Sequence, residues 1–239
     1  GIFEGVVEGV DHSLRVTLID VGQGDAILVE TPRGARLLID AGPGGFGFSA
    51  GERFIEPLLR RKGIDRLDAI LLTHPHADHI GGASHVLENV RVGRIITSGE
   101  VGSSRTFREV NRLAHERGVP LCTVRAGDTI LVDPLLRAYV LFPQAPRDHA
   151  RNANNMSLVL KLQHGAVAWL FPGDAEDDVE ELLASRYGSF LRSNVLKVGH
   201  HGSSTSSSPV FLDAVRPEIA VISVGYRNKF NHPSAAVLG

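Results

Sequence analysis

The sequence has very little of the material that builds disulfide scaffolds and metal–thiolate sites. Among 239 residues there is one cysteine, Cys122. A single cysteine cannot form an internal disulfide framework, and it also excludes zinc sites built from several cysteines. Tryptophan and tyrosine are scarce as well, with one and three copies. That leaves few side chains for an aromatic cage around a quaternary ammonium group.

Long apolar runs are also missing. No stretch approaches about 18 consecutive apolar residues, so we expect no part of the chain to span a membrane, and the start at Gly1–Glu4 lacks the pattern of a signal peptide. Charge of one sign is not in excess either: 25 basic and 27 acidic side chains give a net charge of -2. This balance argues against a nucleic-acid binder that works through overall basicity. With 43% hydrophobic and 22% charged residues, we expect one globular domain over residues 1–239.

Short apolar segments and amphipathic segments follow one another along the chain, which predicts an α/β protein. The predicted strands are 14–19, 25–30, 36–39, 67–72, 94–97, 135–142, 157–162, 167–171, 195–198 and 219–224. The predicted helices are 52–62, a helix that ends near residue 86 or 87, 107–117, 177–187 and 209–215. In each half a buried strand ends in a histidine-bearing loop that opens a helix. Two such halves would pack sheet against sheet with helices outside, an αββα four-layer sandwich.

What the chain has in plenty is histidine, with 11 copies. The densest group is residues 73–79, Thr-His-Pro-His-Ala-Asp-His, at the end of a predicted buried strand. Alternate side chains of an extended or tightly turned loop project the same way, so His74 and His76 can converge on one ion. Asp78 and His79 begin a helix and point at a second ion. Imidazole and carboxylate ligands suit zinc, manganese or iron.

A lone histidine in a loop is more often solvated or hydrogen-bonded than a ligand. That is our interpretation of five others, namely His12, His85, His115, His149 and His164. Asp174 ends a strand in Phe-Pro-Gly-Asp, where its carboxylate could bridge two ions or only cap the helix that follows. His232 could close the ligand set of the second ion. Asp40, which follows another strand, is either a turn residue or an acceptor that orients the histidine loop.

Five segments carry a resemblance to a known family: His-Pro-His-Ala-Asp-His at 74–79, Leu-Ile-Asp-Val-Gly-Gln-Gly-Asp-Ala at 18–26, Leu-Ile-Asp-Ala-Gly at 38–42, Asn-Asn-Met-Ser-Leu-Val-Leu at 154–160 and Lys-Val-Gly-His-His-Gly-Ser at 197–203. The first resembles the metal-binding motif of the metallo-β-lactamase superfamily. Together the five resemble the C-terminal domain of the ComEC family of bacterial DNA-uptake channels. Phosphorylcholine esterases of the same superfamily share much of this pattern.

The resemblance implies a metallo-β-lactamase fold with two divalent ions, manganese or zinc. It places His74 and His76 on the first ion and Asp78 and His79 on the second, with Asp174 bridging. His232 would complete the second set, and Asp40 would lie behind the ligands. The third motif of the superfamily usually supplies a histidine, but residues 154–157 here are Asn-Asn-Met-Ser. An amide oxygen such as that of Asn155, a water or His149 would fill the gap, which favours harder ions such as Mn²⁺.

Two ions about 3.5–4 Å apart can activate water near neutral pH. Asp78, as a ligand, and the paired His200 and His201 are therefore the expected catalytic residues. The two histidines, with Ser203 and Ser204, also suit a substrate phosphate, because imidazoles can donate to a phosphoryl oxygen or protonate a leaving alkoxide. A solvated serine-rich loop is the alternative interpretation of residues 203–208.

The resemblance implies a nuclease that cleaves DNA, with single-stranded DNA and the remainder of the membrane channel as partners, on the extracytoplasmic face of the inner membrane. It would degrade the non-transported strand during DNA uptake in competence. Of the 25 basic residues, 21 are arginine, the side chain that pairs bidentately with phosphate. Arg105, Arg108 and Arg112 share one face of a predicted helix, and Arg227 and Lys229 precede His232.

Two further hypotheses stay open. One is a phosphodiesterase for a small substrate such as a phosphorylcholine ester, which the shortage of tryptophan and tyrosine disfavours. The other is a non-catalytic domain that binds DNA or supports the channel, its metal site degraded at the third motif. A β-lactamase or thioesterase is the least favoured, because the His-His-Gly-Ser segment has no evident use there.

Overall fold

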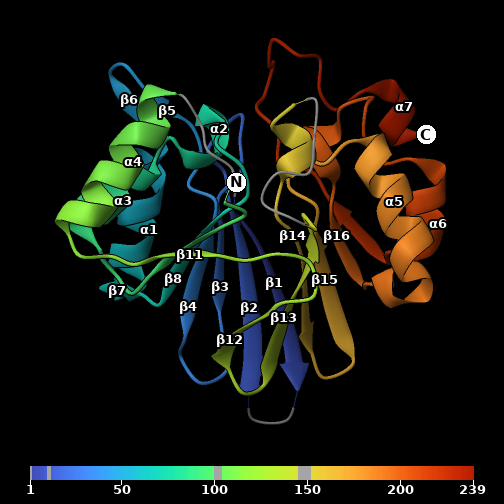
Figure 1. Ribbon diagram of the computed structural model, residues 1–239, viewed down its shortest axis with the longest axis horizontal. Coiled ribbons are helices and arrows are strands. Elements are labelled where there is room, and N and C mark those ends of the chain that lie inside the picture. The colour runs from blue at the N-terminus through green and yellow to red at the C-terminus, as the bar shows by residue number, and fades with distance from the viewer. Residues whose placement is uncertain (1, 10–11, 100–103, 145–151) are drawn as a thin grey trace. The chain divides into compact units, whose positions relative to one another are not determined.

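The computed structural model describes residues 2–9, 12–99, 104–144 and 152–239. The chain divides into two compact units, Gly1–Val124 and Arg125–Gly239. Each unit has its own sheet and its own helices (Figure 1). None of the helices in the described ranges combines the length and the apolar composition that a membrane crossing requires.

The first unit contains a seven-stranded sheet in the order β1-β2-β3-β4-β8-β10-β11. Neighbours from β1 to β4 are antiparallel, whereas β4, β8, β10 and β11 run parallel. All four residues of β8 are buried, which agrees with the continuous apolar run predicted for a central parallel strand. The bounds are β1 (Ile2–Gly9), β2 (His12–Ile19), β3 (Ile27–Glu30), β4 (Arg36–Ile39), β8 (Ala69–Leu72), β10 (Ile95–Thr97) and β11 (Leu121–Thr123).

Two short strand pairs lie outside this sheet: β5 (Gly44–Gly45) with β6 (Phe48–Ser49), and β7 (Arg66–Leu67) with β9 (Arg91–Val92). The strand predicted at 67–72 is thus interrupted at Asp68. The backbone N–H of Asp68 donates to Arg36 O over 2.8 Å, and its carboxylate accepts the N–H of Arg36 over 2.8 Å. This exchange with the start of β4 divides the predicted strand into β7 and β8.

The helices of the first unit are a π-type turn, η1 (Gly51–Ile55), followed by α1 (Glu56–Arg61), α2 (Ala77–Ile80), α3 (Ala83–Asn89) and α4 (Arg105–Glu116). Pro57 falls in the first turn of α1, where its missing N–H costs nothing. Helix α4 starts two residues before the prediction, because the Ser104 hydroxyl caps it by accepting the N–H of Phe107 over 3.1 Å. Apolar side chains of α3 and α4 belong to one buried cluster with β4, β8 and β10.

The second unit contains a six-stranded sheet in the order β12-β13-β14-β15-β16-β17. Pairs from β12 to β15 are antiparallel and β15, β16 and β17 run parallel. The strand bounds are β12 (Thr129–Asp133), β13 (Leu136–Phe142), β14 (Val159–His164), β15 (Val167–Phe171), β16 (Val195–Lys197) and β17 (Ile219–Val221). The helical bounds are η2 (Asn154–Met156), α5 (Asp177–Tyr187), η3 (Gly188–Leu191), η4 (Gly199–Gly202), α6 (Pro209–Val215) and α7 (Ala235–Leu238).

Helices α5 and α6 cover one face of this second sheet. Their buried Val179, Leu183, Phe211 and Val215 share a cluster with Leu196 of β16. The topology repeats a theme of the first unit, in which a buried parallel strand ends in a histidine-bearing turn: β8 leads to His74 and β16 leads to His200. This recurrence was predicted from the sequence, and the α/β character of both halves is confirmed.

Candidate metal centre

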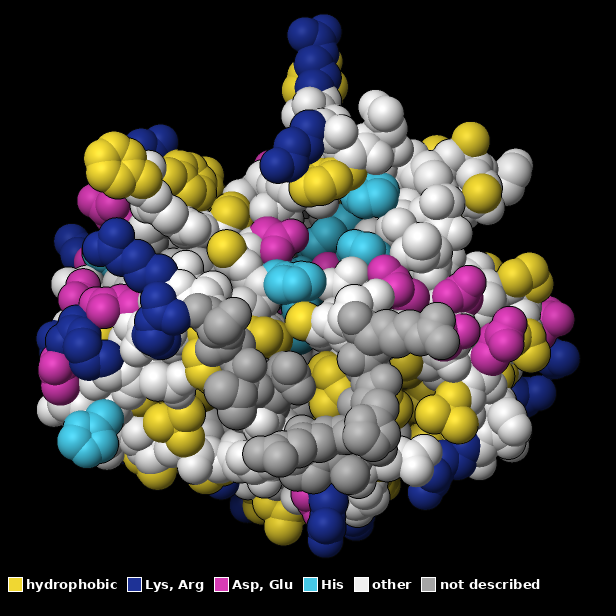
Figure 2. Space-filling view, turned by 45° about the horizontal axis from the view of Figure 1, so that its top comes forward, with side chains coloured by type: hydrophobic (Ala, Val, Ile, Leu, Met, Phe, Trp, Pro, Cys, Tyr) yellow, Lys and Arg dark blue, Asp and Glu magenta, His cyan; other side chains and the backbone are white. Residues whose placement is uncertain are grey.

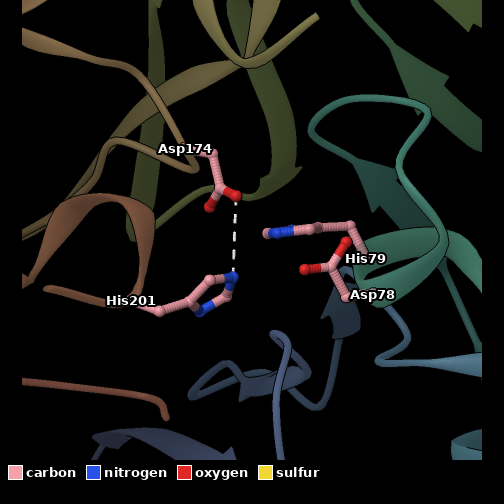
Figure 3. A group of neighbouring side chains, drawn as sticks. All are labelled: Asp78, His79, Asp174 and His201. Carbon is pink, nitrogen blue, oxygen red and sulfur yellow. Dashed lines mark ion pairs between the residues drawn. The ribbon is translucent and has the colours of Figure 1, made fainter. Parts of the chain in front are cut away.

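The first histidine turn connects β8 to α2. His74 and His79 are buried, and His76 stands in extended conformation immediately before α2. The sequence prediction that Asp78 and His79 begin a helix is confirmed. Figure 3 shows both side chains leaving α2 on the same side.

His74 and His76 approach each other through their ring nitrogens. Nε2 of His74 lies 3.1 Å from Nδ1 of His76. The Thr73 hydroxyl donates to Asp40 Oδ2 and lies 3.1 Å from Nδ1 of His74, so its oxygen can accept a hydrogen bond from the N–H at that nitrogen. The ligand nitrogen of His74 is then Nε2. Two imidazole nitrogens this close can both reach one ion at about 2.0–2.1 Å.

Asp40 holds this turn in place from behind. Its carboxylate accepts the N–H of Thr73 at 2.8 Å and the Thr73 hydroxyl at 2.7 Å. Nδ1 of His79 donates to Asp40 Oδ2 over 2.7 Å, so Nε2 is the nitrogen that can act as a ligand. Burial raises the pKa of Asp40, and the neighbouring His79 works against this rise. Asp40 has a φ of 56°, a strained backbone conformation of the kind that gathers at functional sites.

Asp25 is a residue to which the sequence analysis gave no role. Ligand atoms of Asp25, Asp40 and His79 lie within 4.8 Å of one another, and all three residues are buried. Asp25 Oδ2 is 3.9 Å from His79 Nδ1. The sequence feature that could have indicated a role for Asp25 is its position at the end of the Gly-Gln-Gly-Asp segment. A carboxylate pair thus surrounds Nδ1 of His79 and fixes the orientation of its ring.

The close packing of the backbone on α2 explains why residue 24 of that segment is glycine. A Cβ at this position, where φ is +135°, would lie 2.2 Å from the carbonyl oxygen of Asp78. The next residue, Asp25, donates its N–H to the same oxygen over 3.3 Å. The backbone of residues 24–25 therefore packs directly on α2 at Asp78, and this approach requires glycine.

The second unit places Asp174 and the paired histidines together. Asp174 follows β15, is buried, and donates its backbone N–H to the Ser157 hydroxyl oxygen over 3.1 Å. Nε2 of His201 lies 3.5 Å from Asp174 Oδ2 (Figure 3), and Nε2 of His200 lies 3.9 Å from it. Nδ1 of His201 donates to the Ser223 carbonyl over 2.9 Å. Because its Nδ1 is held by a carbonyl and its Nε2 faces a carboxylate, the buried His201 is arranged like a metal ligand.

The backbone of His200 and His201 is unusual. Their φ angles are 45° and 55°, two consecutive left-handed residues in η4. The Ser206 hydroxyl donates to Gly199 O over 2.8 Å and to Ser203 O over 3.1 Å. The carboxylate of Glu180 accepts the N–H groups of Ser207 and Ser208, each at 2.7 Å. These buried bonds fix the segment in which the two histidines lie.

His200 is only half-buried, in contrast to the buried His201. Burial lowers the pKa of His200, against the opposing effect of Asp174. Of the two serines predicted to bind substrate, Ser203 is buried, with its hydroxyl 3.0 Å from that of Thr205, whereas Ser204 is exposed. The hydroxyl available to a substrate is therefore that of Ser204.

The third-motif region presents Asn154 rather than its neighbour. Asn155 uses its side-chain oxygen to accept the N–H of Glu176 at 2.9 Å. Asn154 Nδ2 lies 3.4 Å from Nε2 of His200, and Asn154 Oδ1 is buried with no hydrogen-bond partner among the described residues. His149, the other candidate, lies outside the described residues. The amide oxygen that suits a ligand role is thus the one next to the predicted Asn155.

His232 lies beside His200, with ring centroids 5.8 Å apart. Its Nδ1 is buried and has no hydrogen-bond partner within the described part of the chain. Burial lowers the pKa of His232, and the nearby His200 and His201 add to this effect. A neutral imidazole with an unpartnered buried nitrogen fits a metal ligand or a contact to substrate.

Each unit therefore carries imidazole and carboxylate groups of the kind that zinc and manganese bind. In the first unit the ligand nitrogens of His74 and His79 are set by acceptors on their other nitrogens, and in the second unit the same is true of His201. The unpartnered oxygen of Asn154 and nitrogen of His232 add to this fit. The residues suit divalent ions; the assignment of each residue to an ion stays a prediction.

Comparison with known proteins agrees with this chemistry. The family model described as the metallo-beta-lactamase superfamily matches residues 19–226. ComE operon protein 3 of Bacillus subtilis (strain 168) is 36% identical over 236 residues, which cover 94% of this chain and 30% of that protein. Competence protein ComA of Neisseria gonorrhoeae is 36% identical over 232 residues, covering 95% of this chain and 29% of that protein. The chain thus spans about 30% of the length of these relatives.

Solved structures support the fold. Igni18, a metallo hydrolase from Ignicoccus hospitalis, aligns with a TM-score of 0.55 at 17% identity, covering 87% of this chain and 82% of that chain. CmlA, a diiron beta-hydroxylase from Streptomyces venezuelae, aligns with a TM-score of 0.57 at 15% identity, covering 93% of this chain and 49% of that chain. The fold class predicted from the sequence is confirmed.

Proposed function

The chain belongs to the metallo-β-lactamase superfamily, and from this premise we propose that it is a metal-dependent nuclease that hydrolyses DNA phosphodiester bonds during competence. The observation that carries the proposal is the turn after β8, where His74 and His76 face each other across 3.1 Å and Asp40 orients His79. Metal-dependent hydrolysis is the chemistry that such a turn supports. DNA is proposed as the substrate because of the resemblance to the ComEC family of DNA-uptake channels, which agrees with the name Competence protein ComA of one relative.

The proposed ligands follow the sequence assignment, with one addition. His74 and His76 would hold the first ion, Asp78 and His79 would hold the second, and Asp174 would be shared between them. His232 was assigned to the second ion from the sequence, and the contact of His201 with Asp174 adds His201 as a candidate for the same role. The oxygen of Asn154 takes the place of the missing third-motif histidine.

When bound, two divalent ions would supply Lewis-acid activation of water and of the phosphoryl oxygen near neutral pH. The protein groups around them position the substrate. His200, half-buried beside Asp174, would donate to a phosphoryl oxygen or protonate the leaving alkoxide, and Ser204 would donate to a second oxygen. Asp40 would keep the ring of His79 in its ligand orientation.

The surroundings of the domain are also proposed from the relatives. The chain matches about 30% of their length, so the remainder of a membrane channel protein is the proposed partner. The nuclease would lie on the extracytoplasmic side of the inner membrane and degrade the strand that is not transported. Single-stranded DNA is then the expected substrate.

The test measures cleavage of single-stranded and double-stranded DNA by the purified chain in EDTA and with Mn²⁺, Zn²⁺ or Mg²⁺. We expect cleavage with Mn²⁺ or Zn²⁺ and none in EDTA. Asp78→Ala removes a proposed ligand and should lower the rate by at least about 100-fold. Asp213→Ala, which changes an exposed aspartate on α6, is the matched control and should cleave at the rate of the unaltered chain.

The nuclease proposal is wrong if metal gives no DNA cleavage above that of Asp78→Ala while a small phosphodiester is hydrolysed. That result would favour a phosphodiesterase for small substrates. No hydrolysis of either substrate, with metal content verified by mass spectrometry, would instead favour a non-catalytic domain that binds DNA or supports the channel.

A further inference from the structure

A projecting loop joins β17 to α7 in the second unit. We call residues 225–231 the Asn228 loop. It rises beyond the rest of the second unit in the red-orange part of the ribbon (Figure 1). Figure 2 shows a projecting column of basic and hydrophobic side chains at the top of the view. The sequence analysis noted its two cations but not its aromatic residues.

Asn228 holds the loop in one conformation. Its Oδ1 accepts the N–H groups of Phe230 and His232 at 3.0 and 3.1 Å. Its Nδ2 donates to the carbonyl oxygens of Gly225 and His232 at 3.0 and 2.6 Å. A single half-buried amide thus satisfies four backbone groups. The loop is therefore a preorganised turn, whose conformation does not depend on a bound ligand.

This turn presents two basic side chains, which lie between two aromatic ones in the sequence. Tyr226 is 88% exposed and Phe230 is 51% exposed. The guanidinium of Arg227 lies 5.2 Å from the centroid of the Tyr226 ring, and Nζ of Lys229 lies 5.0 Å from the centroid of the Phe230 ring. Neither cation has a carboxylate partner among the described residues. Two exposed rings and two uncompensated positive charges thus occupy one tip.

The base of the loop is attached to the histidine motif of the second unit. The Phe230 ring stacks on that of His232, with centroids 5.6 Å apart and planes 15° apart. The N–H of Ser234 donates to Gly202 O over 2.8 Å, and Gly202 packs so closely on Pro233 that a Cβ would lie 2.7 Å from the Cβ of the proline. The rings of Phe230, His232 and His200 thus follow one another from the tip to His200, the first two stacked and the last two tilted by 52°.

We infer that the Asn228 loop is a binding platform for single-stranded DNA, an inference that rests on the proposed nuclease function. The bases stack on Tyr226 and Phe230, and the phosphates pair with Arg227 and Lys229. Stacking on aromatic rings combined with basic side chains is the general chemistry of single-strand binding. Double-stranded DNA keeps its bases stacked on one another, so the platform selects the single strand. A loop that inserts into a membrane would have an apolar tip, whereas cations lie between the rings here.

The experiment measures binding without catalysis. Fluorescence anisotropy in EDTA follows a labelled oligothymidylate of about 15 nucleotides. Tyr226→Ser combined with Phe230→Ser should raise Kd about 10- to 100-fold, because the variant loses the stacking of one base on each of the two rings. Arg227→Ala combined with Lys229→Ala should reduce the slope of log Kd against log salt by about 1.4, or about 0.7 for each phosphate contact.

The matched control is Leu131→Ser combined with Arg137→Ala. It removes an exposed apolar side chain and an exposed arginine from β12 and β13 of the same unit and should leave both Kd and the salt slope unchanged. Circular dichroism melting of every variant verifies that it is folded. An Asn228→Ala variant, which keeps all four tip side chains, should weaken binding through loss of the fixed turn.

Two results would overturn the inference. One is an unchanged Kd in the folded Tyr226/Phe230 double variant. The other is that this double variant loses binding to anionic phosphatidylglycerol vesicles but keeps its affinity for DNA. That result would make the loop a membrane contact. Failure of the nuclease proposal is distinguishable, because it would show in the metal-dependent cleavage assay while the anisotropy result in EDTA stands on its own.

Discussion

β8 in the first unit and β16 in the second unit both run inside the parallel part of a sheet, and both end in a turn that carries two histidines. The turns are held in different ways. After β8 the histidines have ordinary backbone conformations, and the strained residue is Asp40, which accepts bonds from Thr73 and His79. After β16 the histidines are themselves left-handed. The Ser206 hydroxyl and the Glu180 carboxylate, which accepts the N–H groups of Ser207 and Ser208, hold the turn.

The two turns fix the second nitrogen of an imidazole in two different ways. A ligand imidazole needs its second nitrogen fixed. A buried carboxylate does this for His79, whereas a backbone carbonyl does it for His201. The carboxylate adds negative charge beside the ring of His79 and raises the basicity of this proposed ligand, while the carbonyl orients the ring of His201. We therefore expect metal binding to be more sensitive to changes behind the first turn, and folding stability to be more sensitive behind the second.

The largest expected effect is that of Asp40→Asn. Asparagine tolerates the φ of 56° but offers one acceptor oxygen where the carboxylate offers two. We expect the affinity for Mn²⁺ or Zn²⁺ to fall about 10- to 100-fold, the usual range for loss of a group behind a metal ligand. Competition with a chromophoric chelator measures it. The matched control is Asp68→Asn, which alters a carboxylate that accepts the N–H of Arg36; equal losses in both variants would contradict the role of Asp40.

A smaller effect is expected from Ser206→Ala in the second turn. The variant removes the buried hydroxyl that bonds to the carbonyls of Gly199 and Ser203. We expect the free energy of unfolding to fall by about 1–2 kcal/mol, measured by urea denaturation. Ser204→Ala, at an exposed serine two residues away, should change it by less than about 0.5 kcal/mol. If Ser206→Ala weakened metal binding as much as Asp40→Asn, the proposed contrast between the turns would fail.

The smallest effect is the pH dependence that Glu180 gives to stability. Burial raises the pKa of Glu180 in the folded chain, although the N–H groups of Ser207 and Ser208 oppose the rise. The folded state then holds the proton more tightly than the unfolded state. Its contribution is fully present below the unfolded pKa and is lost as pH rises through the folded pKa.

Urea denaturation between about pH 4 and pH 7 measures this contribution. We expect the stability of Glu180→Gln relative to the unaltered chain to improve as pH rises over this range. Glu181→Gln, at the exposed neighbour on α5, is the control and should run parallel to the unaltered chain. A difference between Glu180→Gln and the unaltered chain that is constant with pH would show that burial of Glu180 does not perturb its titration.

Local signals were enough to predict many elements. β4, β15, α5 and α6 begin and end at the predicted residues 36–39, 167–171, 177–187 and 209–215. Proline in the first turn of α6 and three acids in the first turn of α5 mark where these helices begin. The strands β1, β11 and β12 were not predicted. β1 and β11 are the two edge strands of the first sheet and β12 is an edge strand of the second, and edge strands need less apolar periodicity because only part of their surface is buried.

For the three arginines of α4, the sequence spacing could have corrected the prediction of a free positive charge. Arg105, Arg108 and Arg112 were expected to offer positive charge on one face of α4. Arg112 instead bonds to Glu109 at 2.6 Å and to Glu116 at 2.5 Å, partners three and four residues away that helical geometry predicts. Its charge is compensated on the helix, in contrast to Arg227 and Lys229 in the Asn228 loop.

The sequence by itself determined the α/β class, the superfamily and the donor groups at residues 74–79, because these depend on apolar periodicity and on residues adjacent in the chain. Only the tertiary structure showed that His201 and His200, and likewise Asn154 and Asn155, differ in their contacts. Neighbours in a strained turn point in different directions, and which of them meets a carboxylate, a carbonyl or solvent depends on contacts with distant segments such as Asp174 and Ser223.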